Sequence, residues 1–564
     1  MSKKRFTITS ALLYANGPIH IGHIAGAYLP ADIFVRYHRL KGDEVLFICG
    51  SDEHGAAITL QAKKEKITPK KIIDKYHELN KKTFSDFGID FSIYHRTSEA
   101  LHHETASDFF SKLNNKNAFV KKESNQYYDK DNDQFLADRY IVGKCPKCHE
   151  DNAYGDQCEK CGATLSPEEL IDPKSSLSKK TPIKKKTTHW YLPMQNHEKW
   201  IKDWIEDGVL DGQLHHNPKN WKNQVISQCK SWIENGLKER AMTRDLDWGV
   251  KVPLVEEAIN KVLYVWLDAP IGYVSATKQW ALENDKNWED YWKKDETKLI
   301  HFIGKDNIVF HCIIFPIILR LMEDYILPYN VPANEFLNLE GSKLSTSKNW
   351  AVWLHEYLEN FADQQDALRY YLCINGPENR DADFSWKDFQ NRNNNELVAI
   401  FGNFVNRVLV LTQKYWNGEI PKKNNLYVKD IDLLDTCNEI IEDVELQIEN
   451  YKFRKGVQGV MNLARLGNKY LAESEPWKIK NDEKRKETIL YTALQIVAKL
   501  SIVSEPFIPF TSKKIRQFLN ISEFNWNDAK KNILKTGVKI NKPELLFSKI
   551  EDEKIQTEID KLKS

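Results

Sequence analysis

The sequence carries almost no net charge. Its 564 residues include 81 lysines and arginines against 80 aspartates and glutamates, which leaves a formal charge of +1 at pH 7. A histone-like or ribosomal-protein-like binder, held to nucleic acid by bulk positive charge, is therefore excluded. A nucleic-acid partner is not excluded, because local basic patches can bind it while the total charge cancels.

Long hydrophobic runs are also missing. The most apolar stretch, residues 308–322, is interrupted by His311, Pro316 and Arg320, and it is shorter than the roughly 20 residues of a membrane-spanning helix. Behind a basic start, the apolar run 11–14 is too short for the core of a signal peptide. We therefore expect no membrane span and no membrane partner.

The cysteine pattern lacks a disulfide framework. The nine cysteines are an odd number, with four clustered between residues 145 and 161 and the others scattered through apolar segments. Disulfide-stapled domains have an even set at regular spacings, so we expect a cytoplasmic, reducing location. Apolar residues make up 41% of the chain, which is enough to bury several cores.

The first 115 residues alternate strand and helix patterns. Residues 5–10 alternate with period two, residues 45–49 form an apolar run of buried-strand length, and a helical stretch lies between them from about 22 to 40. This order predicts a βαβ unit and a parallel sheet. Strand-like segments return at 261–267 and 299–303, so we expect one α/β sheet that is interrupted and then resumed.

The interruption begins at about residue 116, where Asn, Lys and Asp become dense. Residues 173–186 are rich in Lys, Ser and Pro, and we expect them to end this insertion in an exposed basic loop. From about 389 to 520 the pattern is helical only. The helical signals are an apolar stripe at Leu397, Phe401, Phe404, Val408 and Leu411, and further helices near 433–450, 454–473 and 484–503.

Two histidines follow the first predicted strand. Residues 18–23 read P-I-H-I-G-H, so His20 and His23 share one side of the first helical turn. Backbone N–H groups and the helix dipole favour a phosphate there. A pair of ordinary surface histidines is the alternative, but the position after a strand is typical of phosphate-binding turns.

A second segment combines glycine, lysine and hydroxyl groups. Residues 341–348 read G-S-K-L-S-T-S-K, so Lys343 and Lys348 bracket three hydroxyl residues. Such a loop can act as a mobile clamp for a polyphosphate. Taken alone, its composition also fits an ordinary surface loop.

In this order the two motifs resemble the HIGH and KMSKS signatures of class I aminoacyl-tRNA synthetases. Four segments narrow the resemblance to the methionyl-tRNA synthetase family: Y-A-N-G at 14–17, F-I-C-G-S-D-E-H-G at 47–55, V-W-L-D-A-P-I-G-Y at 265–273 and H-F-I-G-K-D at 301–306. The resemblance covers residues 5 to about 520. It implies ATP-dependent activation of L-methionine to methionyl-adenylate, with Mg²⁺ accompanying ATP, and transfer to the 3′-terminal ribose of tRNA(Met).

The resemblance also implies site residues. The catalytic residues would be His20, His23, Lys343 and Lys348. ATP would bind to His20, Gly22, His23, Gly304, Asp306, Lys343, Ser345, Thr346 and Ser347. Methionine would bind to Leu12, Tyr14, Asp52, Trp266, Ala269, Pro270, Tyr273 and His311.

The side-chain chemistry suits these roles. Asp52 and Asp306 follow predicted strands, at the sheet edge where ligands bind, and an aspartate can hold an ammonium group. The rings of Trp266 and Tyr273 suit a thioether. A core tryptophan is the alternative for Trp266.

The clustered cysteines form two Cys-x-x-Cys pairs. Cys145 and Cys148 are followed, after nine residues, by Cys158 and Cys161. Four thiolates fit a tetrahedral zinc site and leave no open position, so we expect one structural zinc ion. Redox pairs or buried thiols are the alternative.

Three residues of the helical part can contact RNA. Asn403 and Arg407 lie four residues apart, off the apolar stripe, and Trp477 stands at a helix end where its ring can stack on a base. Alone, they are ordinary surface residues and a half-buried tryptophan. By the resemblance they lie where the anticodon of initiator and elongator tRNA(Met) is read.

The lysine loop departs from the family pattern. Thr346 stands at the usual second lysine of KMSKS and Leu344 at the methionine, while Leu13 replaces a proline of many relatives. We hypothesise that Lys343 and Lys348 share the stabilisation of the departing pyrophosphate, with Thr346 contributing a hydroxyl.

These features predict a Rossmann-like, parallel-sheet catalytic domain split by a zinc-binding insertion and followed by an all-α anticodon-binding bundle. We expect a monomer. The expected parts are two catalytic halves at 1–115 and 231–330, the insertion at 116–230, a lysine-loop and stem-contact segment at 331–388, the bundle at 389–545 and a tail at 546–564.

Two alternatives remain, another enzyme of the same class and a binding protein without catalysis. A class I synthetase for an aliphatic amino acid or cysteine would need a different pocket, and the chain is too short for a large editing insertion. A non-catalytic tRNA-binding paralogue would keep the bundle and lose the phosphate groups. His20, His23 and Lys343 argue against the second alternative, although Thr346 keeps it open.

Overall fold

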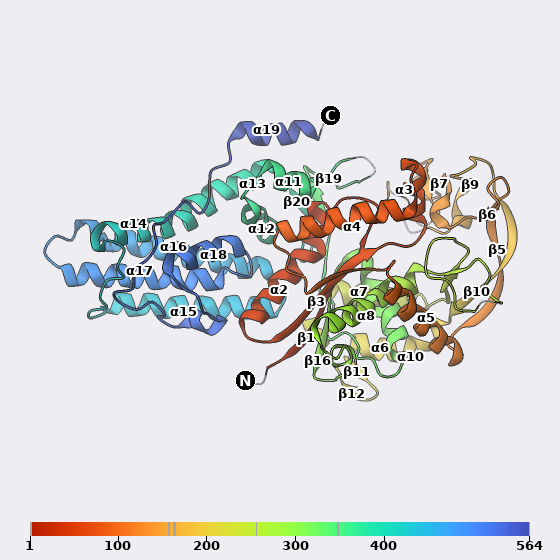
Figure 1. Cartoon of the computed structure of the whole chain (residues 1–564), viewed down its shortest axis with the longest axis horizontal. Coiled ribbons are helices and arrows are strands. Elements are labelled where there is room, and N and C mark those ends of the chain that lie inside the picture. The colour runs from red at the N-terminus through yellow and green to blue at the C-terminus, as the bar shows by residue number, and fades with distance from the viewer. Residues whose placement is uncertain are drawn as a thin grey trace.

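The computed structural model describes residues 3–155, 158, 160–161, 165–254, 256–346 and 349–562. The molecule is elongated, with an α/β part at one end and a helical bundle at the other (Figure 1). Among the described residues, every helix is too short or too polar to span a lipid bilayer.

A parallel sheet lies at the centre of the α/β part. β1 (Arg5–Ser10) pairs with β3 (Glu44–Asp52) on one side and β16 (Thr297–Gly304) on the other, so that Ile8 lies opposite both Phe47 and Ile300. The interrupted sheet expected from the sequence is thus confirmed. The remaining strands are β2 (Leu13–Tyr14) and β4 (Ile93–Arg96) beside β3, and β17 (Ala333–Asn334) beside β16.

The strand expected at residues 261–267 is wrong. Only β15 (Val262–Leu263) is extended, and it pairs with β14 (Thr243–Arg244) outside the central sheet. α8 (Val265–Asn284) begins two residues later. Its apolar first turn belongs to a buried helix, and a short apolar run does not distinguish a buried helix from a buried strand.

The helix expected at 22–40 is confirmed, with one departure from α geometry. It comprises α1 (Ile21–His23), a π-helical turn (Ile24–Tyr28) and α2 (Leu29–Leu40). The side-chain amide of Asn334 donates a hydrogen bond of 2.9 Å to the Ala25 carbonyl inside the π-helical turn. Such single π turns are frequent at functional sites.

The insertion is β structure as far as Leu192 and then forms two helices, α6 (Glu198–Glu206) and α7 (Asn223–Glu234). Its longest pair is β5 (Val120–Asp129) with β10 (Ile183–Leu192), and β7 (Ile141–Lys144), β8 (Ala153–Tyr154) and β9 (Ile171–Ser175) form a smaller sheet. We expected a basic loop at 173–186. This is wrong for both ends of that segment, because residues 173–175 belong to β9 and residues 183–186 to β10. Its lysines stay exposed, because cross-strand pairing with β5 orders the backbone without burying them.

A connecting segment leads from the sheet to the bundle. It contains β18 (Leu337–Leu339), β19 (Ser342–Lys343) and β20 (Ala382–Phe384), and the helices α11 (Leu354–Asn360), α12 (Gln365–Ile374) and α13 (Trp386–Arg392). The C-terminal helix α19 (Asp552–Lys561) lies beside α13 (Figure 1) and buries Ile555.

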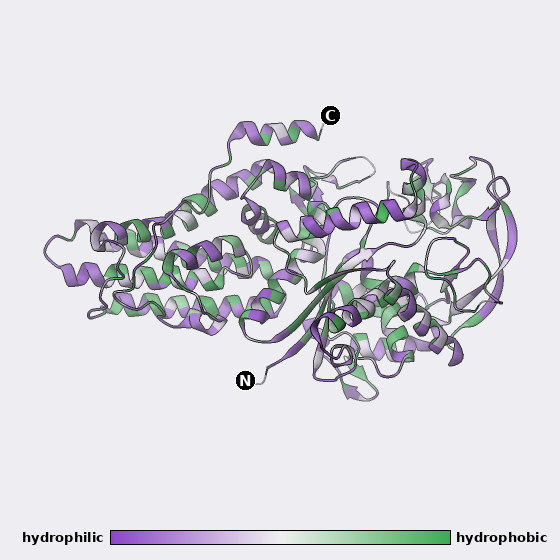
Figure 2. Cartoon of the chain, viewed as in Figure 1, coloured by the Kyte–Doolittle hydropathy of each residue, from purple (hydrophilic) through white to green (hydrophobic). Residues whose placement is uncertain are grey.

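The expected helical region is confirmed. Four of the five residues of the apolar stripe are buried, and Leu411 is half-buried. Hydrophobic and hydrophilic residues alternate along the bundle helices (Figure 2). The helices are a π-helical turn (Asn393–Gly402), α14 (Asn403–Trp416), α15 (Val428–Glu449), α16 (Phe453–Ser474), α17 (Glu483–Val503) and α18 (Pro509–Leu519). α17 is the central helix of the bundle, because every residue from Thr488 to Val503 is buried.

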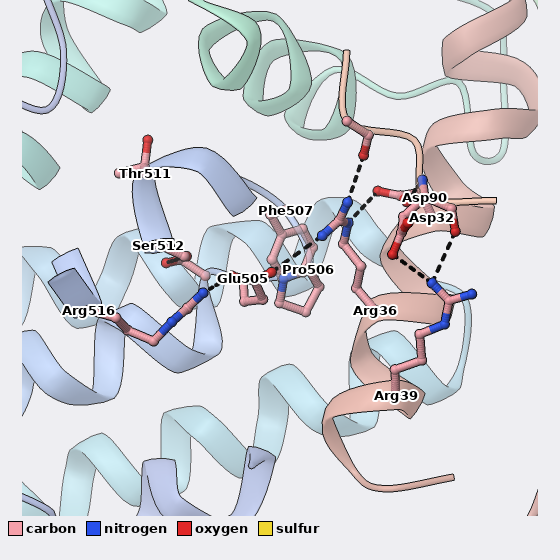
Figure 3. Close-up of polar contacts among 12 residues, drawn as sticks. Asp32, Arg36, Arg39, Asp90, Glu505, Pro506, Phe507, Thr511, Ser512 and Arg516 are labelled. Atoms are coloured by element: carbon pink, nitrogen blue, oxygen red, sulfur yellow. Dashed lines mark hydrogen bonds and ion pairs between the residues drawn. The ribbon is translucent and has the colours of Figure 1, made fainter. Parts of the chain in front are cut away.

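Charged side chains join the bundle to α2. Arg36 donates to Asp32 on the same helix over 2.8 Å and to Glu505, between α17 and α18, over 3.3 Å (Figure 3). Glu505 also accepts a 2.7 Å hydrogen bond from Arg516 of α18. These side chains are largely buried, so they hold the helix that follows the histidine turn against the bundle.

Candidate functional site

His20 and His23 lie at the start of α1 with their rings stacked. The ring centroids are 3.7 Å apart at an angle of 18°. His20 Nδ1 accepts the Gly22 N–H at 3.1 Å, and His23 Nδ1 accepts the His20 N–H at 3.2 Å. In the neutral form, each ring therefore carries its proton on Nε2, where it can donate to a ligand.

Burial keeps both rings neutral. It lowers the pKa of His23 to about 4, and burial followed by the neighbouring His23 lowers the pKa of His20 well below its ordinary value. Two neutral N–H donors at a helix start can bind a phosphate without a charge of their own.

The histidine turn pairs with the segment that leaves the lysine loop. The Ile21 N–H donates to the Val352 carbonyl at 3.1 Å, and the Leu354 N–H donates to the Ile19 carbonyl at 3.0 Å. A Cβ on Gly22 would lie 2.6 Å from Leu344 Cδ1, so glycine allows the loop to approach. Two motifs that are distant in the sequence thus form one site.

The two ends of the lysine loop pair with each other through the backbone. Ser345 and Trp350 exchange backbone hydrogen bonds of 3.0 and 2.9 Å, and Thr346 is exposed at the turn. Lys343 is exposed at the end of β19. Ser347 and Lys348 lie outside the described residues.

Gly304 and Asp306 lie beside this loop. Gly304 ends β16, and Asp306 is in the short 3₁₀ turn that follows, at the expected sheet edge. Asp306 is exposed at this edge, and the positive charges of Lys305 and Lys343 act on its carboxylate. Lys343 and Asp306 are therefore close enough for their charges to interact.

The expected methionine residues of α8 share one face of that helix. Trp266, Ala269, Pro270 and Tyr273 have the spacing i, i+3, i+4 and i+7. The Trp266 ring packs edge-on against Phe310, with centroids 4.3 Å apart. Leu12 faces the same helix, since a Cβ on Gly272 would lie 2.8 Å from Leu12 Cδ1.

Tyr273 and His311 are hydrogen-bonded at the buried end of this face. His311 Nδ1 donates to the Asn307 carbonyl at 3.0 Å, so Nε2 accepts the Tyr273 hydroxyl proton at 2.9 Å. Burial lowers the pKa of His311 to about 4 and raises that of Tyr273. Both groups are therefore neutral, as a thioether pocket requires.

Asp52 is the last residue of β3 and lies opposite Tyr14 of β2. Its carboxylate is buried, and burial followed by the charge of Asp268 raises its pKa to about 8. Burial followed by the charge of Asp52 also raises the pKa of Tyr14. A carboxylate in this position can bind an ammonium group strongly.

The four cysteines of the insertion converge. Their sulfur atoms all lie within 4.8 Å of one another, with Cys145 3.9 Å from Cys161 and Cys148 3.5 Å from Cys158. Four thiolates around zinc at about 2.3 Å are about 3.8 Å apart in a tetrahedron. A backbone N–H bond, chiefly from Cys148, lowers the pKa of Cys145 to about 7. These residues fit a zinc ion.

Asn403, Arg407 and Trp477 gather at one place on the bundle. The Arg407 guanidinium lies 5.2 Å from the centre of the Trp477 ring, and Asn403 is exposed one helical turn before Arg407. The Trp477 side chain is 38% exposed, so part of its surface is open to a base.

Comparison with known proteins agrees with this geometry. A family model described as tRNA synthetases class I (M) matches residues 6–409, and one described as the anticodon binding domain of methionyl tRNA ligase matches residues 420–563. The chain belongs to the methionyl-tRNA synthetase family. The resemblance and the fold class expected from the sequence are thereby confirmed.

Individual relatives are similar over nearly the whole chain. The methionine–tRNA ligases of Bacteroides fragilis and Cytophaga hutchinsonii are each 57% identical to it, over 99% of this chain and 81% of their own length. A solved Mycobacterium tuberculosis methionyl-tRNA synthetase in complex with methionyl-adenylate has the same fold. Its TM-score is 0.79 at 21% identity, and the match covers 96% of this chain and 99% of that one.

Sequence reasoning missed three buried residues next to Asp52. His54, His102 and Asp268 form a hydrogen-bonded cluster in which both imidazoles contact the carboxylate. His54 and Asp268 stand inside two of the segments that carry the family resemblance, which is the signal that points to them. His102 has no such signal, because a lone histidine in a helix is most often an ordinary core or surface residue.

Proposed function

We propose that this chain is a methionine–tRNA ligase. A carboxylate oxygen of L-methionine attacks the α-phosphorus of ATP as the bond to the β-phosphate oxygen breaks, which gives methionyl-adenylate and pyrophosphate. The 2′-hydroxyl of the terminal ribose of tRNA(Met) then attacks the adenylate carbonyl, and AMP leaves. The observation that carries this proposal is the pairing of the histidine turn with the lysine-loop segment through Ile21 and Leu354.

The protein supplies no nucleophile in this scheme. His20 and His23 donate hydrogen bonds to phosphate oxygens through Nε2, and Lys343 and Lys348 stabilise charge on pyrophosphate as it departs. Mg²⁺ bound with ATP neutralises phosphate charge. The remaining nucleotide contacts are Gly22, Gly304, Asp306, Ser345, Thr346 and Ser347.

Methionine lies against the shared face of α8. Asp52 receives the ammonium group, and Trp266, Tyr273 and His311 surround the thioether, with Leu12, Tyr14, Ala269 and Pro270 completing the pocket. Holding both reactants in line converts a bimolecular reaction into an effectively unimolecular one.

Further features belong to the same proposal. Asn403, Arg407 and Trp477 read the anticodon of initiator and elongator tRNA(Met), and the four cysteines hold one structural zinc. The chain works as a cytoplasmic monomer with the domain boundaries expected from the sequence.

The test is pyrophosphate–ATP exchange measured with each amino acid in turn. Exchange with L-methionine alone is the expected result. Exchange without an amino acid, or with a different one, contradicts the proposal. An absence of exchange together with tight tRNA(Met) binding supports the non-catalytic paralogue instead.

A further inference from the structure

Three buried side chains from three different elements meet beside Asp52. His54 follows β3, His102 lies in α5 (Ala100–Asn115), and Asp268 lies in the first turn of α8. His54 Nδ1 is 2.7 Å from one oxygen of Asp268, and His102 Nε2 is 2.5 Å from the other. All three side chains are buried.

The short distances identify hydrogen bonds rather than metal coordination. Donor atoms at about 2.0–2.1 Å from a tetrahedral zinc are more than about 3 Å apart, whereas the imidazole and carboxylate atoms here are 2.5 and 2.7 Å apart. An ionised carboxylate only accepts hydrogen bonds, so both nitrogens facing it carry protons. The cluster is an anion held by two N–H donors.

The other ring nitrogen of His102 contacts Ser275 and so fixes the orientation of the imidazole. His102 Nδ1 is 2.9 Å from the hydroxyl of Ser275, which also lies 3.1 Å from the Gly272 carbonyl. Burial alone would raise the pKa of Asp268, but the two imidazoles outweigh it and hold the pKa well below its usual range. Asp268 is therefore charged at neutral pH.

Asp52 is linked to the cluster through His54. The His54 N–H donates to Asp52 Oδ1 over 3.4 Å, while the ring of the same residue bonds Asp268. Two carboxylates in one desolvated site cannot both ionise freely, so one of them takes up a proton. The two imidazole N–H donors favour the ionised form of Asp268, so the proton is expected on Asp52, which the cluster reaches through the His54 backbone N–H.

We propose that His54, His102 and Asp268 form a positioning cluster, which holds Asp268 as a fixed anion beside Asp52 so that the ammonium group of the amino acid is received by a pair of buried carboxylates. This inference rests on the proposed function, since it assumes that Asp52 binds the ammonium group. With the pKa of Asp52 near 8 in the free protein, methionine binding at pH 7 releases close to one proton from Asp52.

Other titratable groups also face this site. Burial lowers the pKa of His54, but the charges of Asp268 and Asp52 outweigh it and raise that pKa. Glu53 is bonded to Arg96 at 2.9 Å and to Ser51 at 2.7 Å. The phenol of Tyr14 has a raised pKa and stays neutral. The ring of His103 packs against His54, and burial lowers its pKa to about 4. Tyr14 and His103 are therefore both neutral at neutral pH.

The experiment is calorimetric titration of the full chain with L-methionine at about pH 7, in two buffers with different ionisation enthalpies, which counts protons released. We expect nearly one proton from wild type and less than about half a proton from Asp268→Asn, because loss of the neighbouring charge lowers the pKa of Asp52.

In pyrophosphate exchange at about pH 8.5, Asp268→Asn should raise KM for methionine about five- to tenfold with little change in kcat.

A second pair of variants keeps the test informative where Asp268→Asn does not fold. His54→Ala removes one donor to Asp268 and should raise KM several-fold, whereas His54→Asn places an amide N–H where Nδ1 was and should restore it. His38→Asn is the matched control, because His38 Nδ1 makes the same 2.7 Å bond to Asp43 at the far end of α2.

The outcomes separate this inference from the proposed function. No exchange and no methionine binding by wild type contradicts the proposed function. Methionine binding without proton release, or with the same release in Asp268→Asn, overturns the cluster's role alone. Equal KM values in His54→Ala, His54→Asn and wild type also overturn it.

Discussion

Arg369 of α12 donates a hydrogen bond to Asp32 of α2 over 2.6 Å, and neither side chain is exposed to solvent. The same guanidinium donates to the carbonyls of Gly88, Pro506 and Phe507 at 3.1 to 3.2 Å. Burial raises the pKa of Asp32, but Arg36 and Arg369 outweigh it and lower the pKa. One side chain thus connects α2 and Gly88 of the α/β part with the connecting segment and the bundle.

We predict that Arg369→Met lowers the free energy of unfolding by about 3–5 kcal/mol, because it leaves Asp32 and three carbonyls without this buried partner. Urea unfolding at neutral pH measures the loss. The matched control is Arg465→Met, because the Arg465 side chain is 44% exposed and lies 3.8 Å from Glu396. That exposed pair should contribute less than about 1 kcal/mol, and equal losses in the two variants contradict the prediction.

The lysine loop should act on the transition state. We predict that Lys343→Ala and Lys348→Ala each lower kcat for pyrophosphate exchange at least about tenfold with little change in KM for methionine, because charge develops on pyrophosphate only as it leaves. Thr346→Lys should partly restore Lys348→Ala, since it returns a cation to the usual KMSKS position. The control is Lys82→Ala. Lys82 forms an exposed ion pair with Asp86 on α4 (Pro69–Asp86). Wild-type exchange by Lys348→Ala refutes the role of that lysine.

The cysteine cluster should bind zinc in solution. Elemental analysis of the purified chain is expected to give close to one zinc per molecule, falling to near zero in a Cys145→Ala, Cys148→Ala double variant. Cys437→Ala, which removes a buried thiol in α15 far from the cluster, should keep its zinc. A zinc-free preparation with full activity and unchanged thermal unfolding contradicts a structural role.

Anticodon reading should be separable from amino acid activation. We predict that Trp477→Ala lowers kcat/KM for tRNA(Met) charging at least about tenfold, since stacking on one base is worth about 1–3 kcal/mol, while pyrophosphate exchange stays unchanged. Val410→Ala is the control, because Val410 is 45% exposed on α14 and is not one of the residues proposed to read the anticodon. A parallel fall in both reactions indicates a folding defect and contradicts the prediction.

Local patterns were sufficient to predict much of the fold. The strands at 5–10 and 299–303, the helix at 22–40 and the long bundle helices agree with the structure, because each follows a hydrophobic period that the chain itself carries. The type of secondary structure was predicted wrongly for one short apolar segment. Residues 265–267 begin a buried helix instead of continuing a strand, and only packing distinguishes the two.

The amino-acid order alone predicts a set of local features: two histidines at a helix start, a lysine loop, two Cys-x-x-Cys pairs and a family resemblance. Tertiary structure alone decided which distant side chains meet. His54, His102 and Asp268, like Arg369 and Asp32, come from separate elements, and no local pattern signals their contact. The physical reason is burial, because the charge on an aspartate or histidine depends on the partners it meets once water is removed.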